Sequence, residues 1–341
     1  MSRNLQALSC STSWRAVPAV SRRRLAVLIT ALAISGDTAT SYAQEQYPAR
    51  EIHLICGFAA GGGADVMYRY FAEKLRVLSG KPVIVENKPG AQGALALTQL
   101  AKSKPDRYTV SLNGGTGVAS ALQRLKAPGF ELKDVDSLTG ILEQSWVLVV
   151  SADSPLKTLS ELTAHLKAKG SKELYGTATT VGTVVAERYK AIAQLEAVQV
   201  NYKTIADSLN DLASGSLDFV MADTGFTLGQ VSKGTVRALA LSTARRAQFM
   251  PGVPTIGEGG VPGIDVSVWW SVLVPAGTPT AATDKLDGWF AEIARMPETA
   301  KFLANNGVDV LIATPAQTKA RQEQDVKNWA EYLRLAKIEP M

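Results

Sequence analysis

Histidine and cysteine are scarce in this 341-residue chain, which contains two of each. His53 lies three residues before Cys56 in one apolar segment, and side chains three apart on a strand point to opposite faces. His165 lies within a helical pattern and is interpreted as a solvated or packed side chain. A histidine-based catalytic triad is therefore poorly supported. No group of histidine, cysteine and acidic residues has the spacing of a metal site, and we expect neither a metal nor a cofactor.

The N-terminus differs in composition from the rest of the chain. Three arginines at 22–24 precede an apolar run at 25–34, and small and polar residues follow up to Ala43. This arrangement is typical of an export signal, so residues 1–43 are predicted to be removed on the way to the periplasm. The run is short for a bilayer-spanning helix, which makes a membrane anchor the weaker alternative. The general and twin-arginine export routes both stay open.

Once the signal is removed, the chain also lacks a marked excess of positive or negative charge. The signal carries five arginines and one aspartate, so its loss lowers the formal net charge from +5 to +1. A nucleic-acid partner would need a clustered basic face, and none is expected here. Cys10 is lost with the signal, so Cys56 has no partner for an intramolecular disulfide. Its place in an apolar segment favours a small buried side chain over a nucleophile.

What the chain does have is a glycine-rich junction between a strand and a helix. The apolar run at 52–56 is typical of a buried parallel strand, and apolar residues spaced three and four apart at 66–78 predict a helix. Gly61, Gly62 and Gly63 lie between them, with Asp65 as the expected N-cap. Such a junction leaves the first helical N–H groups open to an anion. A tight turn without a ligand is the alternative.

The same order of strand, glycine-bearing loop and helix recurs along the chain. Further strands are predicted at 83–87, 108–112, 146–150, 174–177, 198–202, 217–222, 236–242, 266–274 and 308–312. Further helices are predicted at 94–103, 158–169, 205–214, 281–294, 297–305 and 315–335, and one more, without defined ends, between Thr183 and Val198. These repeats indicate parallel βαβ units, whose loops gather at the edge of a sheet where ligands bind.

Two such sets of elements predict an α/β fold of two lobes, each a mostly parallel sheet flanked by helices. The first lobe is expected to contain residues 44–145 and 270–341, and the second lobe residues 146–269. A cleft between the lobes is the expected ligand site.

The loops at this expected cleft are rich in glycine, threonine, asparagine and serine. They offer backbone N–H groups and hydroxyls but few ionisable side chains, which suits binding a carboxylate without transforming it. Asp223, at the end of a predicted strand, either accepts a hydrogen bond from a ligand or caps a helix. The glycines at 115–117 and 57–63 lack the partners that nucleotide-binding motifs need.

Several ordered motifs match a known family. They are the segments 48–65, 85–93, 201–203, 215–219 with Asp223, 233–240, 253–255 and 275–279. In these motifs the chain resembles the tripartite tricarboxylate transporter substrate-binding proteins, also known as the Bug family, over nearly all of its expected mature length. The resemblance implies a monomeric, type II-like periplasmic binding protein that closes on a small organic carboxylate. Its implied partners are the membrane permease subunits of a tripartite carrier.

The resemblance also implies a set of ligand-binding residues. In the first lobe they are Phe58, Ala59, Gly61, Gly62, Asn113 and Thr116, and in the second lobe Thr179, Gly182, Thr183 and Asp223. Helix N-terminal amides from both lobes would hold the carboxylate oxygens. The loop at 176–185 departs from the family pattern because it is shorter and more apolar. A less polar or aromatic carboxylate is therefore as well supported as a di- or tricarboxylate.

Two other functions stay open from the sequence. One is a receptor that presents its closed form to a membrane signalling protein. The other is an exported α/β enzyme that uses Asp223 or Cys56.

Overall fold

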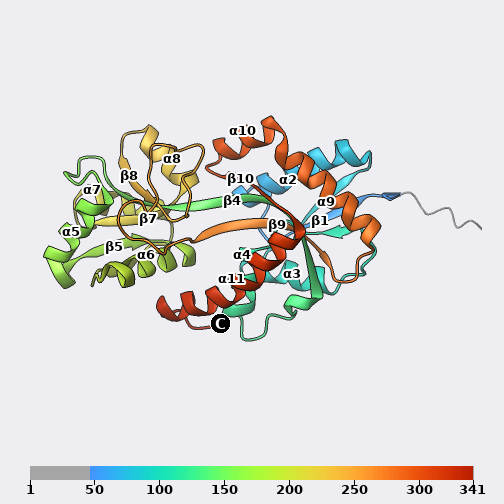
Figure 1. Cartoon of the computed structure of the whole chain (residues 1–341), viewed down its shortest axis with the longest axis horizontal. Helices are drawn as coiled ribbons and strands as arrows, with labels where there is room; N and C mark the ends of the chain where they lie inside the picture. The colour runs from blue at the N-terminus through green and yellow to red at the C-terminus, as the bar shows by residue number, and fades with distance from the viewer. Residues whose placement is uncertain (1–46, 341) are drawn as a thin grey trace, which may run out of the picture. The chain divides into compact units, whose positions relative to one another are not determined.

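The structure, a computed structural model, describes residues 47–340 (Figure 1). The predicted signal at 1–43 and Cys10 lie outside the described residues. The strands are β1 (Ile52–Cys56), β2 (Val83–Asn87), β3 (Thr109–Val110), β4 (Val135–Ser151), β5 (Leu174–Thr177), β6 (Val198–Asn201), β7 (Phe219–Asp223), β8 (Val236–Leu241), β9 (Ser267–Pro275) and β10 (Asp309–Ala313). The α-helices are α2 (Gly63–Ser79), α3 (Ala94–Ala101), α4 (Thr116–Arg124), α5 (Leu159–Lys169), α6 (Thr180–Ala193), α7 (Leu209–Ala213), α8 (Thr224–Ser232), α9 (Thr280–Arg295), α10 (Pro297–Asn305) and α11 (Pro315–Leu335).

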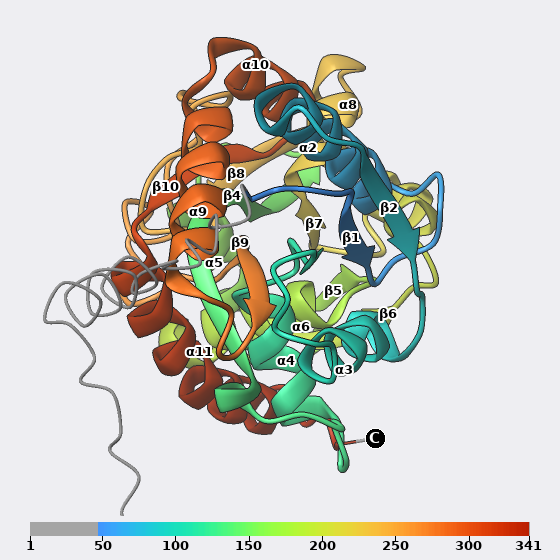
Figure 2. The ribbon, with the colours of Figure 1, turned by 90° about the vertical axis from the view of Figure 1, so that its right-hand side faces the viewer.

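The first sheet is parallel, as the βαβ pattern predicts. Its strand order is β2-β1-β3, and every residue of β1 pairs with β2, from Ile52 opposite Val83 to Cys56 opposite Asn87. Helix α2 connects β1 to β2. Figure 2 shows α2 and α3 on opposite sides of these strands. The apolar run of β1 is buried on both faces for this reason.

The second sheet is mixed, with the strand order β10-β4-β7-β5-β6 and with β8 and β9 also paired to β4. Strand β5 pairs parallel to β6 and β7, whereas β4 pairs antiparallel to β7, β8, β9 and β10. Parallel pairing is therefore confirmed within βαβ units, and the pairs made by β4 are the exception.

Strand β4 is much longer than predicted. The predicted segment 146–150 is only the last part of a strand that runs for 17 residues. Its first part pairs with β9 and its last part with β7 and β8, and the register shifts near Gly140. Polar residues such as Asp136 and Ser137 interrupt the apolar pattern there, which is why the pattern located only the end of the strand. In Figure 1, β4 and β9 run together between two groups of elements.

Buried side chains form a separate core in each group. One large cluster joins α2, β1 and α9 through residues such as Tyr68 and Phe290. The other joins α5, α6 and β7 through residues such as Tyr189 and Phe219. We refer to these groups as the first and second lobes, and we count α4, which packs against α3, with the first lobe and α8, which packs against β7, with the second. Trp329 of α11 belongs to the second cluster, although residues 270–341 were predicted in the first lobe. The predicted lobe boundaries at 145–146 and 269–270 therefore stay a prediction.

Two helices were not located by the sequence patterns. Helices α4 and α8 each begin within two residues of glycine and contain threonine, residues that favour loops and turns. Helices α5, α9, α10 and α11 lie where they were predicted. The capping box of Thr158 and Glu161 at the start of α5 is confirmed.

Within residues 47–340, none of the helices combines the length and the apolar character needed to cross a membrane.

The burial of β1 gives a direct test of the first sheet. Ile52 is fully buried, whereas Ile84, on the neighbouring strand, is 43% exposed. Ile52→Ala should lower the free energy of unfolding by about 2–5 kcal/mol because it leaves a cavity. The matched change Ile84→Ala should cost less than about 1 kcal/mol. Urea unfolding followed by circular dichroism measures both, and equal losses would contradict the assigned burial.

Candidate functional site

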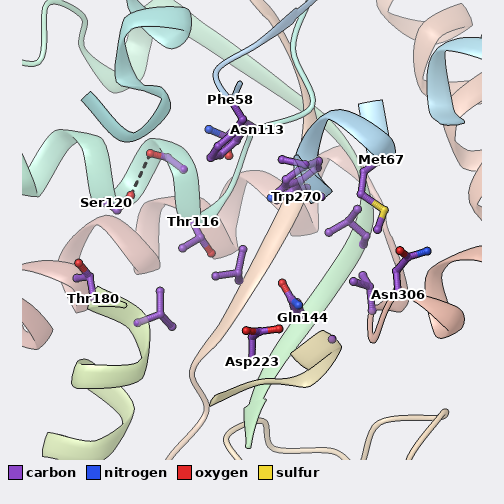
Figure 3. A pocket seen from close by; sticks show the side chains of 18 of the residues that line it. Phe58, Met67, Asn113, Thr116, Ser120, Gln144, Thr180, Asp223, Trp270 and Asn306 are labelled. Atoms are coloured by element: carbon purple, nitrogen blue, oxygen red, sulfur yellow. Dashed lines mark hydrogen bonds between the residues drawn. The ribbon is translucent and has the colours of Figure 1, made fainter. Parts of the chain in front are cut away.

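Four helices begin at one cavity of about 490 Å³ (Figure 3). The cavity is lined by first-turn residues of all four helices: Gly63 and Ala64 of α2, Thr116 and Gly117 of α4, Thr180 and Val181 of α6, and Gly225 of α8. The first N–H groups of a helix have no acceptor within the helix, and the helix dipole makes this end partly positive. The cavity is therefore surrounded by groups that favour an anion.

The four helix starts differ in how they are capped. The N-caps of α2 and α4 are Gly62 and Gly115, which provide no side-chain hydrogen bond. The hydroxyl of Thr179 accepts a hydrogen bond from the Gly182 N–H of α6, and the carboxylate of Asp223 accepts one from the Phe226 N–H of α8 at 2.9 Å. The second-lobe helices thus use their own side chains as acceptors, and those of the first lobe do not.

Asp65 holds the glycine loop in front of α2. Its carboxylate accepts hydrogen bonds from the Gly61 N–H, the Arg69 Nε and the Asn87 Nδ2, at 2.8–2.9 Å. Only 2% of Asp65 is exposed, and these donors, Arg69 first, lower its pKa to about 2. The prediction of Asp65 as N-cap is wrong. Gly62 is the N-cap, and Asp65 lies in the first turn, from which its side chain reaches back to the loop and across to β2.

Asn113 and Thr116 lie at the start of α4 and have different roles. The Thr116 hydroxyl donates to the Ser267 carbonyl at 3.3 Å and accepts from the Trp269 N–H at 3.1 Å, which anchors α4 to β9. Asn113 is 3% exposed, and its Nδ2 has no hydrogen-bond partner among the described residues. A Cβ at Gly117 would lie 2.3 Å from Asn113 Oδ1, so a glycine there leaves room for this amide. Asn113 thus offers a buried donor at the cavity.

Aromatic and aliphatic side chains form the wall between the helix starts. Phe58 stacks on Trp270 with ring centroids 6.2 Å apart and an interplanar angle of 10°, and Tyr68 makes a T-shaped contact with Trp270. Trp329 of α11 lines the cavity as well. The other apolar lining residues are Met67, Leu142, Val181, Val268 and Val308.

Charged side chains are few at this cavity. Among the described lining residues, Arg124 and Asp223 are the ones that carry a charge. Burial lowers the pKa of Arg124 from its usual value. Asp223 both lines the cavity and caps α8, so the two alternatives for this residue are compatible. Figure 3 places Asp223 and Gln144 across the cavity from Asn113 and Phe58.

The structure brings together part of the ligand-binding set that the resemblance implies. Four of its ten residues line the cavity: Phe58, Asn113, Thr116 and Asp223. Three others, Ala59, Gly61 and Gly62, lie in the exposed loop just before Gly63. The last three, Thr179, Gly182 and Thr183, lie at the start of α6. They form hydrogen bonds with one another or with Gln199. Binding of a ligand by these ten residues stays a prediction.

Several lining residues were missed because they come from distant segments. They are Arg124, Gln144, Trp270, Asn306 and Trp329. The one sequence feature that pointed to any of these lining residues was the adjacent pair Trp269 and Trp270 in the predicted strand at 266–274. Trp269 is fully buried and donates to Asp325, whereas Trp270 faces the cavity.

Of the residues considered for catalysis, Asp223 lines the cavity, whereas Cys56, His53 and His165 do not. Cys56 is fully buried, burial raises the pKa of its thiol, and it does not line the cavity. His53 lies on β1 next to Glu86. His165 lies on α5, near Asp218. Within the described part of the chain, no group of three histidine, cysteine or acidic side chains is placed to hold a metal ion.

Comparison with known proteins identifies the family. The family described as "Tripartite tricarboxylate transporter family receptor" matches residues 67–336. The chain belongs to this family. The receptor is 32% identical to the "UPF0065 protein in gbd 5'region" of Cupriavidus necator over 292 residues, which are 84% of the receptor and 86% of that protein.

Solved structures agree with this assignment. The receptor is similar to "R. palustris Rpa4515 with adipate", with a TM-score of 0.71 and 25% identity, covering 86% of the receptor and 100% of that chain. It is also similar to "periplasmic binding protein BugD", with a TM-score of 0.66 and 29% identity, covering 86% and 99%. The expected fold of a two-lobed periplasmic binding protein is confirmed, and the receptor is a solute-binding protein of the periplasmic type.

The role of Asp65 can be tested by removing its charge. Asp65→Asn should lower the free energy of unfolding by about 2 kcal/mol, since hydrogen bonds to a buried charge are lost. Because the pKa of Asp65 is lower in the folded than in the unfolded protein, its contribution is present above about pH 4 and is lost as the pH falls through about 2. The stability difference between the two proteins should therefore shrink over this range in urea unfolding at several pH values.

The matched control for this test is Glu73→Gln on the same helix. Glu73 pairs with Arg76 on the exposed surface, where solvent screens the ion pair, so its loss should leave the unfolding free energy almost unchanged. An Asp65→Asn protein as stable as this control would refute the anchoring role.

Proposed function

We propose that this receptor captures a small organic carboxylate in the cavity and delivers it to the permease subunits of a tripartite carrier. The observation that carries the proposal is the convergence of the uncapped N-termini of α2 and α4 on the cavity. The similar R. palustris protein, whose structure is described as being with adipate, supports a carboxylate ligand.

The carboxylate would bind through backbone amides. The N–H groups of Gly63 and Thr116 begin helices whose N-caps are glycines and provide no side-chain acceptor, and both residues line the cavity. A carboxylate there accepts hydrogen bonds and interacts favourably with two helix dipoles. The Nδ2 of Asn113 adds a side-chain donor that has no other partner among the described residues. Donors of this kind bind a carboxylate without an activated nucleophile.

Capture would be coupled to closure of the two lobes. Strands β4 and β9 pair along most of their length, and β4 contributes to the cores of both lobes through residues such as Leu142 and Leu148. Two lobes joined by a few continuous elements can close around a ligand by bending at those elements. The closed form would then be the form that the permease subunits recognise.

A thermal shift experiment tests the ligand class. The purified protein is heated with mono-, di-, tri- and aromatic carboxylates, and with neutral amides and amino acids as controls. A ligand at 100 times its dissociation constant should add roughly 2.7 kcal/mol of stability, which raises the melting temperature clearly. Stabilisation by carboxylates alone is the expected result. Stabilisation only by another class of compound would refute the proposal.

The role of the α2 amide can be tested at Gly63. Proline suits the first position of a helix, and the extended backbone of Gly62 (φ −77°, ψ 166°) suits the residue before a proline. Gly63→Pro should therefore keep the fold but remove one N–H. Because a hydrogen bond to a charged group contributes about 1.5–3 kcal/mol, we expect carboxylate affinity to fall at least tenfold in calorimetry.

The control for this variant is Gly63→Ala. A Cβ at Gly63 meets no atom within 4 Å, and alanine keeps the N–H. Its affinity should stay much closer to that of the unchanged protein. If proline and alanine weaken binding equally, the amide does not bind the ligand.

A further inference from the structure

The two sides of the cavity differ in what they offer to an anion. On the first-lobe side, the N-caps of α2 and α4 provide no side-chain hydrogen bond, and the buried Nδ2 of Asn113 has no hydrogen-bond partner within residues 47–340. On the second-lobe side, the side chains of Thr179 and Asp223 already accept hydrogen bonds from the first turns of α6 and α8. Each of these two caps occupies one N–H of its helix start, so the first-lobe side is the more open anion-binding end, and we call it the open end.

The charges at the cavity also oppose a second carboxylate. Arg124 and Asp223 are the charged lining residues of the described chain, so the lining has no formal excess of positive charge. Asp223 lies across the cavity from Asn113 (Figure 3). A dicarboxylate held at the open end would direct its second negative charge toward this side, and like charges close together repel in a partly buried site.

The wall between the two sides suits an apolar ring. Phe58 and Trp270 present stacked rings, and Tyr68 contacts Trp270 in a T-shaped arrangement with 5.5 Å between ring centroids. Trp329 of α11 and Met67 of α2 line the same cavity. Aromatic side chains prefer offset or edge-to-face contacts with another ring, and they gain by burying its apolar surface.

We propose that the ligand is a monocarboxylate with an apolar, ring-bearing body, and not a di- or tricarboxylate. This inference rests on the proposed function and specifies its substrate class. The carboxylate binds at the starts of α2 and α4, the ring lies against Phe58, Trp270 and Trp329, and the end of the body that faces Asp223 carries no negative charge.

Matched acids that differ only in a second carboxylate test this inference. Calorimetry on the purified protein compares benzoate with terephthalate and hexanoate with adipate. We expect the monocarboxylate of each pair to bind at least tenfold more tightly, and benzoate to bind more tightly than hexanoate. Tighter binding of either dicarboxylate would overturn the inference and leave the proposed function intact. No binding by any of the four acids would contradict both.

The charge of Asp223 is tested through the ratio of the two affinities. Asn also caps helices well, so Asp223→Asn keeps the start of α8 while removing the charge. The preference for benzoate over terephthalate should fall about tenfold in this variant. In the control Asp284→Asn, an exposed position on α9, the ratio should not change. If the benzoate-to-terephthalate affinity ratio is the same in the unchanged protein, Asp223→Asn and Asp284→Asn, the inference is overturned. A preference of the unchanged protein for terephthalate that is lost in Arg124→Gln would also overturn it.

Discussion

The first backbone N–H groups of a helix have no acceptor within that helix, and four helices of this receptor begin at one cavity. Two of these helix starts are capped by Thr179 and Asp223 of the second lobe, and two are left to glycine N-caps of the first lobe. The glycine N-caps keep the cavity open to a ligand, and the buried carboxylate of Asp65 holds the loop in front of α2 in place. The asymmetry between the lobes follows from these few side chains.

The long strand β4 explains how the two lobes form one molecule. Its first part belongs to a core with Tyr68 and Phe290, and its last part to a core with Tyr189 and Phe219. The paired strand β9 places Trp270 at the cavity and Trp269 against Asp325 of α11. Because β9 anchors α4 through Thr116, the elements that join the lobes also position the anion-binding end.

The local features of this fold could be predicted from the sequence because neighbouring residues carry them. The apolar run of β1, the glycines before α2 and the capping box at Thr158 each lie within a short segment. The long strand β4 could not be predicted in full, since polar residues at 136–137 break its pattern. Trp329, nearly 60 residues beyond Trp270, reaches the cavity only through the path of α11, which no periodicity reveals.

The two tryptophans at the cavity have a practical consequence. Trp270 comes from β9 and Trp329 from α11, so the indole rings report from two different elements on the same space. An occupant that displaces water from this space changes the polarity around both rings. The chain therefore carries its own fluorophores for occupancy, and an optical sensor could be built from it without an attached dye.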